Sequence, residues 1–271
     1  MPPRPGAMSS PLDLIHHLLE NGPRKTHITT RRVRVIHNHT YILDTTKAIH
    51  VWEHDGYPQY YFPVSELKNC KLRDKETIEK NGKVVGAVVE LTISAKGGIA
   101  EVTTDQVIRF VDDDHLGVLK GLARLEFKAM DQWLEEDVPI HVHPKDPFKR
   151  IETLPSTRTV EVKIEGVTVA KSASSVHLLE TGLPTRYYLP LTSVVQGTFR
   201  KSNLVTKCPY KGEAEYYNIV VGGVEKENLV WYYRTPTHES AAVAGLVCFY
   251  NEKVDILLDG ELLERPKTWF S

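Results

Sequence analysis

The stretch His50-Val51-Trp52-Glu53, followed by Tyr60-Tyr61-Phe62-Pro63, indicates the architecture of this chain because it occurs twice. The second copies are His177-Leu178-Leu179-Glu180 and Tyr187-Tyr188-Leu189-Pro190. Both pairs have the same offset, since 177 − 50 and 187 − 60 each give 127. One offset shared by separate motifs indicates an internal repeat. We therefore predict two homologous domains.

Strand patterns surround the repeated motifs. Val33-Arg34-Val35 and Val160-Glu161-Val162 alternate apolar and charged residues, as half-buried strands do. Gly97-Gly98 and Gly222-Gly223 each separate two β-rich runs. Glycine pairs suit hairpin turns, because glycine accepts a positive φ. The predicted fold class is therefore mainly β (α+β).

Helices are expected to be few. We predict one short helix in each domain, over residues 114–123 and 238–249. Residues 126–136 fit either a helix or a strand, and the repeat favours the strand. An earlier helix begins after the capping residue Ser10 and ends at Asn21-Gly22-Pro23. The predicted domains are an N-terminal extension with this helix (1–31), a first β domain (32–143), a linker (144–158) and a second β domain (159–271).

Composition narrows the function classes. The 271 residues include 34 Lys plus Arg and 35 Asp plus Glu, so the formal net charge is −1. Such a balance provides no overall basic footprint for nucleic acid or anionic lipid. The longest uncharged apolar run, Ala241–Tyr250, has ten residues, whereas a membrane-spanning helix needs about 20. Three cysteines do not form a disulfide framework. We expect a cytoplasmic protein without nucleic-acid or membrane partners.

The segment Cys208-Pro209-Tyr210-Lys211-Gly212 is the most distinctive candidate for chemistry. An ammonium close to a thiol favours the nucleophilic thiolate, and lysine also holds anionic ligands. A buried, inert cysteine beside a surface lysine fits the same pattern. At the repeat offset, Lys83 stands at the position of Cys208 and Gly86 at that of Lys211. A site kept only in the second domain explains this difference, and so does drift of packing residues.

Aromatic side chains gather in the second half of the chain. Rings with polar tips suit a pocket that stacks a planar or sugar ring, and they suit a half-exposed sheet equally well. Glu239 fits a general base and a helix-capping residue about equally. The candidate ligand-binding residues are Tyr188, Tyr210, Tyr216, Trp231 and Tyr233, and the candidate catalytic residues are Cys208, Lys211 and Glu239.

Histidine pairs form a second, weaker pattern. His37-Asn38-His39 and His141-Val142-His143 would each place two imidazoles on one strand face. Imidazole pairs bind zinc or copper, but neither pair has cysteine ligands at zinc spacing. Phosphate-loop, dinucleotide-binding, zinc-protease and nucleophile-elbow motifs are absent from the sequence. We expect no metal and no cofactor.

The Cys208–Gly212 segment resembles the hallmark of the family called domain of unknown function 427. The stretch 183–190, Ala244-Gly245-Leu246 and Val254-Asp255 match this family too, and His143–Pro147 with Arg150 resembles the connector of its tandem members. The resemblance covers about residues 32–271. It implies two β-tent-like domains, in which two sheets meet over a cleft, and a nucleotidyltransferase-like label. The Gly-Ser and paired aspartates of a polymerase-like metal site are missing. The residues carried over by position are Tyr188, Cys208, Pro209, Lys211, Gly212, Tyr216 and Trp231.

Three functions are compatible with these patterns. The first is binding of a small polar or ring-containing ligand in a cleft of the second domain, with Lys211 as an anchor. The second is an enzyme with Cys208 as nucleophile, assisted by Lys211 and by Glu239 or His238. The third is a scaffold without catalytic activity. A small molecule is the expected partner, and the sequence leaves a homodimer open.

Overall fold

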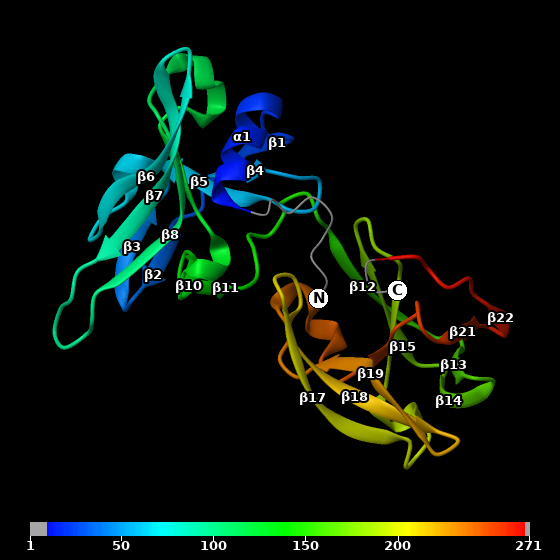
Figure 1. Cartoon of the computed structure of the whole chain (residues 1–271). Coiled ribbons are helices and arrows are strands. Elements are labelled where there is room, and N and C mark those ends of the chain that lie inside the picture. Colours follow the sequence, from blue (N-terminus) through cyan, green and yellow to red (C-terminus); the bar gives the residue numbers. More distant parts are fainter. Residues whose placement is uncertain (1–9, 269–271) are drawn as a thin grey trace. The chain divides into compact units, whose positions relative to one another are not determined.

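The computed structural model describes residues 10–268, and its contacts divide the chain into two units, Met1–Asp146 and Pro147–Ser271 (Figure 1). Each unit is a β domain with a seven-stranded and a four-stranded antiparallel sheet. The predicted architecture of two homologous β domains with an N-terminal helix is confirmed. Among the described helices, none is long and apolar enough to cross a membrane.

The first domain orders its larger sheet β1-β4-β5-β9-β8-β7-β6 and its smaller sheet β11-β10-β2-β3. Short 3₁₀ helices connect some of the strands. The strands are β1 (Lys25–Ile28), β2 (Val33–His37), β3 (Thr40–Thr45), β4 (Ile49–Trp52), β5 (Gln59–Pro63), β6 (Lys71–Lys80), β7 (Lys83–Ile93), β8 (Val102–Phe110), β9 (Leu122–Leu125), β10 (Gln132–Glu135) and β11 (Val138–Ile140), and the 3₁₀ helices are η1 (Val64–Glu66), η2 (Asp114–Leu119) and η3 (Phe127–Ala129).

The second domain repeats this plan strand for strand. Its sheets have the orders β12-β15-β16-β20-β19-β18-β17 and β14-β13-β21-β22. Its strands are β12 (Ile151–Ser156), β13 (Val160–Ile164), β14 (Val167–Ser172), β15 (Ser175–Glu180), β16 (Arg186–Leu189), β17 (Phe199–Cys208), β18 (Gly212–Val221), β19 (Val224–Tyr233), β20 (Val247–Phe249), β21 (Asp255–Leu258) and β22 (Glu261–Leu262), and its 3₁₀ helices are η4 (Leu191–Ser193) and η5 (His238–Val243).

Alternation along the strands separates the two faces of each larger sheet. In β5, Tyr60 belongs to the cluster that packs against the smaller sheet, while Tyr61 belongs to a cluster on the opposite face. In β16, Tyr187 and Tyr188 divide in the same way. We call the face toward the smaller sheet the inner face and the other the outer face. The period of two in a strand explains the division.

The outer face of the first domain is covered by α1 (Pro11–Asn21), which contacts β7 and β8 (Figure 1). The predicted start is confirmed, because Ser10 caps the helix by accepting a hydrogen bond from the Asp13 amide at 3.1 Å. Leu14, Ile15 and Leu18 are buried against the sheet. The close approach needs Gly86, because a Cβ there would lie 3.0 Å from Cγ2 of Ile15.

The two predicted mid-domain helices are shorter than expected. η2 ends at Leu119 and η5 at Val243, and the residues that follow form the central strands β9 and β20. Gly121 and Gly245 stand at the boundary with φ of 67° and 71°, which a continuing helix does not allow. Residues 126–136, expected to be a strand, divide into η3 and β10.

The expected extension and linker both contain strands. β1 lies within residues 1–31 and pairs with β4, and β12 lies within residues 144–158 and pairs with β15. Lys25 lies opposite Trp52, and Glu152 lies opposite Leu179. The register is therefore equivalent, since 152 − 25 and 179 − 52 both give the repeat offset.

The histidine pairs do not lie on strand faces as predicted. Asn38 and His39 have φ of 46° and 57° in the turn between β2 and β3, and Val142 has a φ of 72°. These left-handed residues break the alternation that would align the two imidazoles. Across residues 10–268, no three His, Cys, Asp or Glu side chains are grouped so that they could hold a metal ion.

Candidate functional site

Most of the aromatic residues proposed from the sequence meet on the outer face of the second domain. This face carries one buried cluster, made of Leu178, Tyr188, Ala214, Tyr216, Trp231, Tyr233, Val243 and Cys248. The side chains pack against one another, and Tyr188 and Cys248 are fully buried. Burial raises the pKa of the Cys248 thiol to about 12, so this cysteine stays protonated at neutral pH.

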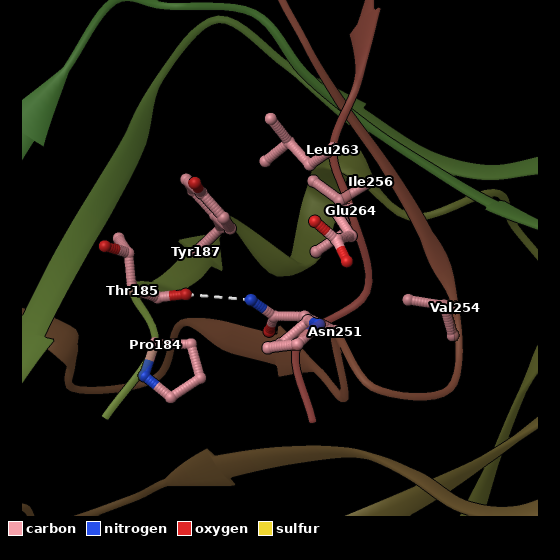
Figure 2. Close-up of a pocket in the computed structure, with 9 residues that line it drawn as sticks. Pro184, Thr185, Tyr187, Asn251, Val254, Ile256, Leu263 and Glu264 are labelled. Carbon is pink, nitrogen blue, oxygen red and sulfur yellow. Dashed lines mark hydrogen bonds between the residues drawn. The ribbon is translucent and has the colours of Figure 1, made fainter. Parts of the chain in front are cut away.

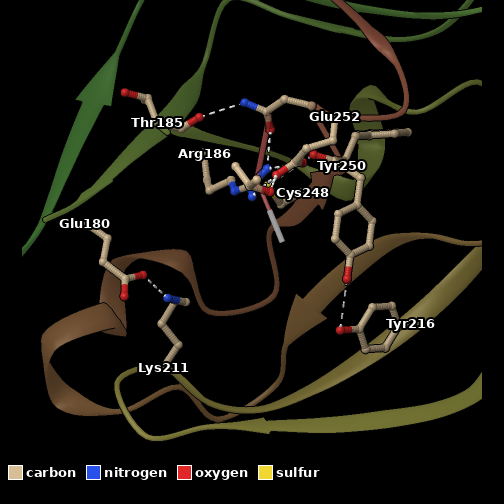
Figure 3. A network of polar contacts seen from close by, with 11 residues as sticks. Glu180, Thr185, Arg186, Lys211, Tyr216, Cys248, Tyr250 and Glu252 are labelled. Atoms are coloured by element: carbon tan, nitrogen blue, oxygen red, sulfur yellow. Dashed lines mark hydrogen bonds and ion pairs between the residues drawn. The ribbon is translucent and has the colours of Figure 1, made fainter. Parts of the chain in front are cut away.

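Hydrogen bonds satisfy the polar groups of three of these rings, those of Tyr188, Tyr216 and Trp231. The Trp231 indole donates to the Tyr188 hydroxyl at 3.0 Å. The Tyr216 hydroxyl lies 2.9 Å from the hydroxyl of Thr206 and 3.5 Å from that of Tyr250 (Figure 3). A pocket wall offers its polar groups to a ligand, whereas these groups bond within the protein. The cluster therefore stabilises the sheet without a ligand.

A buried ion pair lies beside the cluster. Arg186 donates to both carboxylate oxygens of Glu252, at 2.6 and 2.7 Å, and to Asn251 at 2.9 Å (Figure 3). Its guanidinium also lies over the Trp231 ring, 5.5 Å from the centroid. Burial acts to raise the pKa of Glu252, but hydrogen bonds from Arg186 and Thr268 outweigh it and hold that pKa below its usual range.

The Cys-Pro-Tyr-Lys-Gly segment forms the turn between β17 and β18. Lys211 is nearly buried and forms an ion pair with Glu180, whose other oxygen lies 3.6 Å from Lys149 (Figure 3). Burial acts to lower the pKa of Lys211, but the nearby Cys208 sulfur and the Glu180 carboxylate raise it overall. Lys211 therefore stays charged, and Glu180 compensates that charge inside the protein.

Turn geometry explains the glycine of the segment. Gly212 has a φ of 97°, and a Cβ there would lie 3.3 Å from the Thr235 carbonyl oxygen. Tyr210 is buried, and its carbonyl accepts a hydrogen bond from the Thr237 hydroxyl. Lys149 lies 5.6 Å from the centre of the Tyr210 ring.

Of the three candidate catalytic residues, the structure brings Cys208 and Lys211 together, because the Cys208 sulfur is close enough to raise the pKa of Lys211. Glu239 is exposed in the first turn of η5.

The first domain has the same buried glutamate with a different cation. Glu53 is the counterpart of Glu180 at the repeat offset, and it accepts hydrogen bonds from Arg124 and Tyr61, each at 2.9 Å. By strand register, Arg124 corresponds to Cys248, because they lie opposite Tyr61 and Tyr188. The cation therefore comes from a central strand in one domain and from a hairpin turn in the other.

Register also corrects the expected equivalence of Gly86 with Lys211. Gly86 lies opposite Phe110 and Ala214 opposite Tyr233, which makes Gly86 the counterpart of Ala214. The stretch from Gly86 to Gly97 is longer than the stretch from Ala214 to Gly222, since 97 − 86 exceeds 222 − 214. The longer hairpin of the first domain shifts the offset along these strands.

A pocket of about 260 Å³ lies on the inner side of the second domain (Figure 2). Tyr187 contributes its ring, and Ile256 and Leu263 contribute apolar surface. In the view of Figure 2, Ile256 and Glu264 lie across the pocket from Tyr187. The complete lining is Pro184, Thr185, Tyr187, Asn251, Val254, Ile256, Leu263, Glu264 and Pro266.

The first domain fills the equivalent position with a tryptophan. Trp133 lies opposite Val35, as Ile256 lies opposite Val162. The indole stacks on Phe127 at 5.0 Å between centroids, lies 6.2 Å from the centre of Tyr60, and donates to the Phe127 carbonyl at 3.1 Å. Tyr60 is the counterpart of Tyr187. One domain thus has a large ring where the other has a short aliphatic chain and a pocket.

Sequence reasoning did not single out the residues of this pocket. The lining includes none of the five aromatic candidates, all of which are buried elsewhere. The sequence has an indole at position 133 and a shorter aliphatic chain at position 256, but both residues are apolar, so no hydrophobic pattern marks the difference.

Comparison with known proteins supports the division into two copies. No curated protein matches this chain. A family model matches it twice, over residues 25–135 and 152–260. The first match spans β1 to β10, and the second runs from within β12 to beyond β21. The chain belongs to the family described as domain of unknown function (DUF427), of which it carries two tandem copies.

Proposed function

We propose that the second domain binds a small ring-containing ligand in the pocket between Tyr187, Ile256 and Leu263. The observation that carries this proposal is the contrast between Trp133 and Ile256 at one position of the same fold. Where the first domain needs an indole to complete its core, the second leaves space bordered by a tyrosine. The three cysteines are free thiols, which fits the reducing, cytoplasmic compartment in which we place the protein.

The lining has the character of a small-molecule site. Ligand pockets combine apolar walls with a few polar groups that orient the ligand. Val254, Ile256 and Leu263 form the apolar part, while Tyr187 and Glu264 contribute polar groups. Burial raises the pKa of Tyr187, so its hydroxyl stays protonated and available as a donor. The polar groups of Tyr188, Tyr216 and Trp231 on the outer face bond within the protein, and we therefore place the ligand on the inner side.

Filling the pocket tests the proposal. Ile256→Trp introduces the residue that the first domain has at this position, and Val205→Trp on an exposed part of β17 is the matched control. We expect indole-type fragments to shift the methyl signals of Leu263 and Val254 in NMR spectra of the wild type and of the control. The Ile256→Trp protein should show no such shifts. Equal shifts in all three proteins would place the fragments elsewhere and contradict the proposal.

A second candidate is an enzyme that uses Cys208 as nucleophile. The observation in its favour is that Lys211 interacts with both Cys208 and Glu180. A fixed ammonium stabilises a neighbouring thiolate, and Glu239 would move the proton. Iodoacetamide should then alkylate Cys208 at neutral pH much faster than Cys70, which is similarly half-buried, and Lys211→Met should remove the difference. Equal rates for Cys208 and Cys70 in the wild type would exclude this role.

A further inference from the structure

We propose that the pocket of the second domain selects a ring that carries a protonated amine, with Glu264 as the counter-ion. This inference rests on the proposed function, because it concerns the ligand of the same pocket. Three features support it. Some polar groups of the lining are bonded within the protein, others have no partner among residues 10–268, and the first domain holds an indole at the equivalent position.

The polar groups of Asn251 and Tyr250 are already engaged. The Asn251 amide donates to the Thr185 carbonyl at 2.8 Å, and its oxygen accepts from Arg186 at 2.9 Å. By strand register, the Tyr250 carbonyl corresponds to the carbonyl of Glu126. It accepts the Lys253 and Val254 amides at 2.8 and 3.1 Å. The Asn251 side chain and the Tyr250 carbonyl are therefore engaged within the protein.

Among the lining side chains, Glu264 has a carboxylate and Tyr187 a hydroxyl that can bind a ligand. Within residues 10–268, the Glu264 carboxylate has no ion pair and the Tyr187 hydroxyl no hydrogen bond, although both residues line the pocket (Figure 2). The neighbouring Arg265 is held by Asp255 at 2.6 Å. The first-domain counterpart of Tyr187, Tyr60, donates to Glu135 at 2.8 Å, but Leu258 replaces that acceptor.

The apolar part of the pocket suits a flat ring. Trp133 shows that this position of the fold accepts an indole beside a tyrosine. With the ring against Ile256 and Leu263, a short chain would carry the ammonium to the rim, where Glu264 is exposed. An ion pair at such a rim contributes modestly, about 2–5-fold in affinity, because water screens it.

Three probes with the same ring test the charge preference. Tryptamine is cationic, tryptophol neutral and indole-3-propionate anionic at neutral pH. Calorimetry with the full chain should rank their affinities in that order, with steps of about 2–5-fold. Glu264→Gln should lower the affinity of tryptamine to that of tryptophol and leave tryptophol unchanged. Glu261→Gln, an exposed carboxylate of β22 outside the lining, is the matched control.

The outcomes separate the two proposals. Equal affinities of the three probes, all abolished by Ile256→Trp, would overturn the charge preference and leave the pocket standing. If Glu264→Gln and Glu261→Gln lower the affinity for tryptamine equally, the preference for a cation comes from the overall charge of the domain. That result would overturn the role of Glu264. If none of the probes binds, or if Ile256→Trp leaves the binding unchanged, the proposed pocket fails together with the inference.

Discussion

Trp133 and Ile256 occupy the same place in two copies of one fold, opposite Val35 and Val162 in the smaller sheets. The indole is buried between Phe127 and Tyr60, whereas the isoleucine borders a pocket. A single exchange of side chain thus distinguishes a closed core from an open one.

Truncation should cost the first domain more than the second. Trp133→Ala removes a buried ring and should reduce the stability of the first domain by about 3–5 kcal/mol. Ile256→Ala should cost about 2 kcal/mol, because part of its surroundings is already empty. Amide hydrogen exchange followed by mass spectrometry reports on each domain separately. Equal losses in the two domains would mean that Ile256 is packed as tightly as Trp133.

Lys211 should be required to compensate the charge of the buried Glu180 carboxylate. Lys211→Met leaves a buried carboxylate, and we expect a loss of about 2–3 kcal/mol, since Lys149 remains 3.6 Å away. Lys211→Met combined with Glu180→Gln should recover part of the loss. The control Lys226→Met removes an ion pair with the exposed Glu165 and should change stability by less than about 0.5 kcal/mol. Urea unfolding measures all three, and a Lys211→Met protein as stable as the control would contradict the assignment.

Acid should destabilise the first domain through His50. Burial, helped by Arg31 and His27, lowers the pKa of His50 from 6.5 to about 4. Above pH 6.5 the ring is neutral in the folded and unfolded states. As the pH falls from 6.5 towards 4, the unfolded chain binds a proton that the folded chain excludes, so up to about 3 kcal/mol of stability is lost.

The ring contacts of His50 suggest a variant that lacks the charge. It lies 4.9 Å from Tyr60 and 6.0 Å from Trp52 between centroids, so His50→Phe keeps an aromatic ring there. Denaturant unfolding at pH 7 and pH 4.5 should show a smaller difference for His50→Phe than for the wild type. His115→Phe, at a solvent-exposed histidine, should behave as the wild type. A pH dependence unchanged by His50→Phe would remove His50 as its source.

Helix α1 should depend on the absence of a side chain at Gly86. Gly86→Ala would place a Cβ 3.0 Å from Ile15 and 3.3 Å from the Arg109 carbonyl, and we expect a loss of about 1–3 kcal/mol from overpacking. Faster amide exchange in α1 would report the loosened helix. In the second domain, Ala214→Gly should cost about 0.5–1 kcal/mol without a helix to release. Unchanged exchange in α1 would show that the helix adapts.

Much of the fold could be predicted from the sequence, because its signals are local or repeated. Ser10 and Gly22 bound α1, the glycine pairs mark hairpins, and the offset of 127 shared by the repeated motifs relates the two domains. The mid-domain helices were predicted to be longer than they are in the structure. Local apolar spacing cannot distinguish a helix from the buried central strands β9 and β20, which are held by neighbours on both sides.

The candidate site was predictable only in part. The sequence predicted an ammonium close to the Cys208 thiol, and in the structure Lys211 interacts with that sulfur. The sequence did not show that the Glu180 carboxylate compensates the charge of Lys211, because Glu180 lies on another strand, far from the turn along the chain. Nor could it tell that the tyrosines and Trp231 bond to one another, since alternation predicts a shared face but not what covers it.

Residue periodicity and turn chemistry were enough to establish the two copies, their strand content and the capped first helix, since these features follow from the order of residues along the chain. Which face of each sheet is closed, and where a pocket remains, depends on packing in three dimensions. Trp133 and Ile256 are both apolar residues in equivalent strands, so no hydrophobic pattern separates them. The difference becomes a cavity only when two sheets pack at a fixed spacing and the smaller side chain leaves the space unfilled.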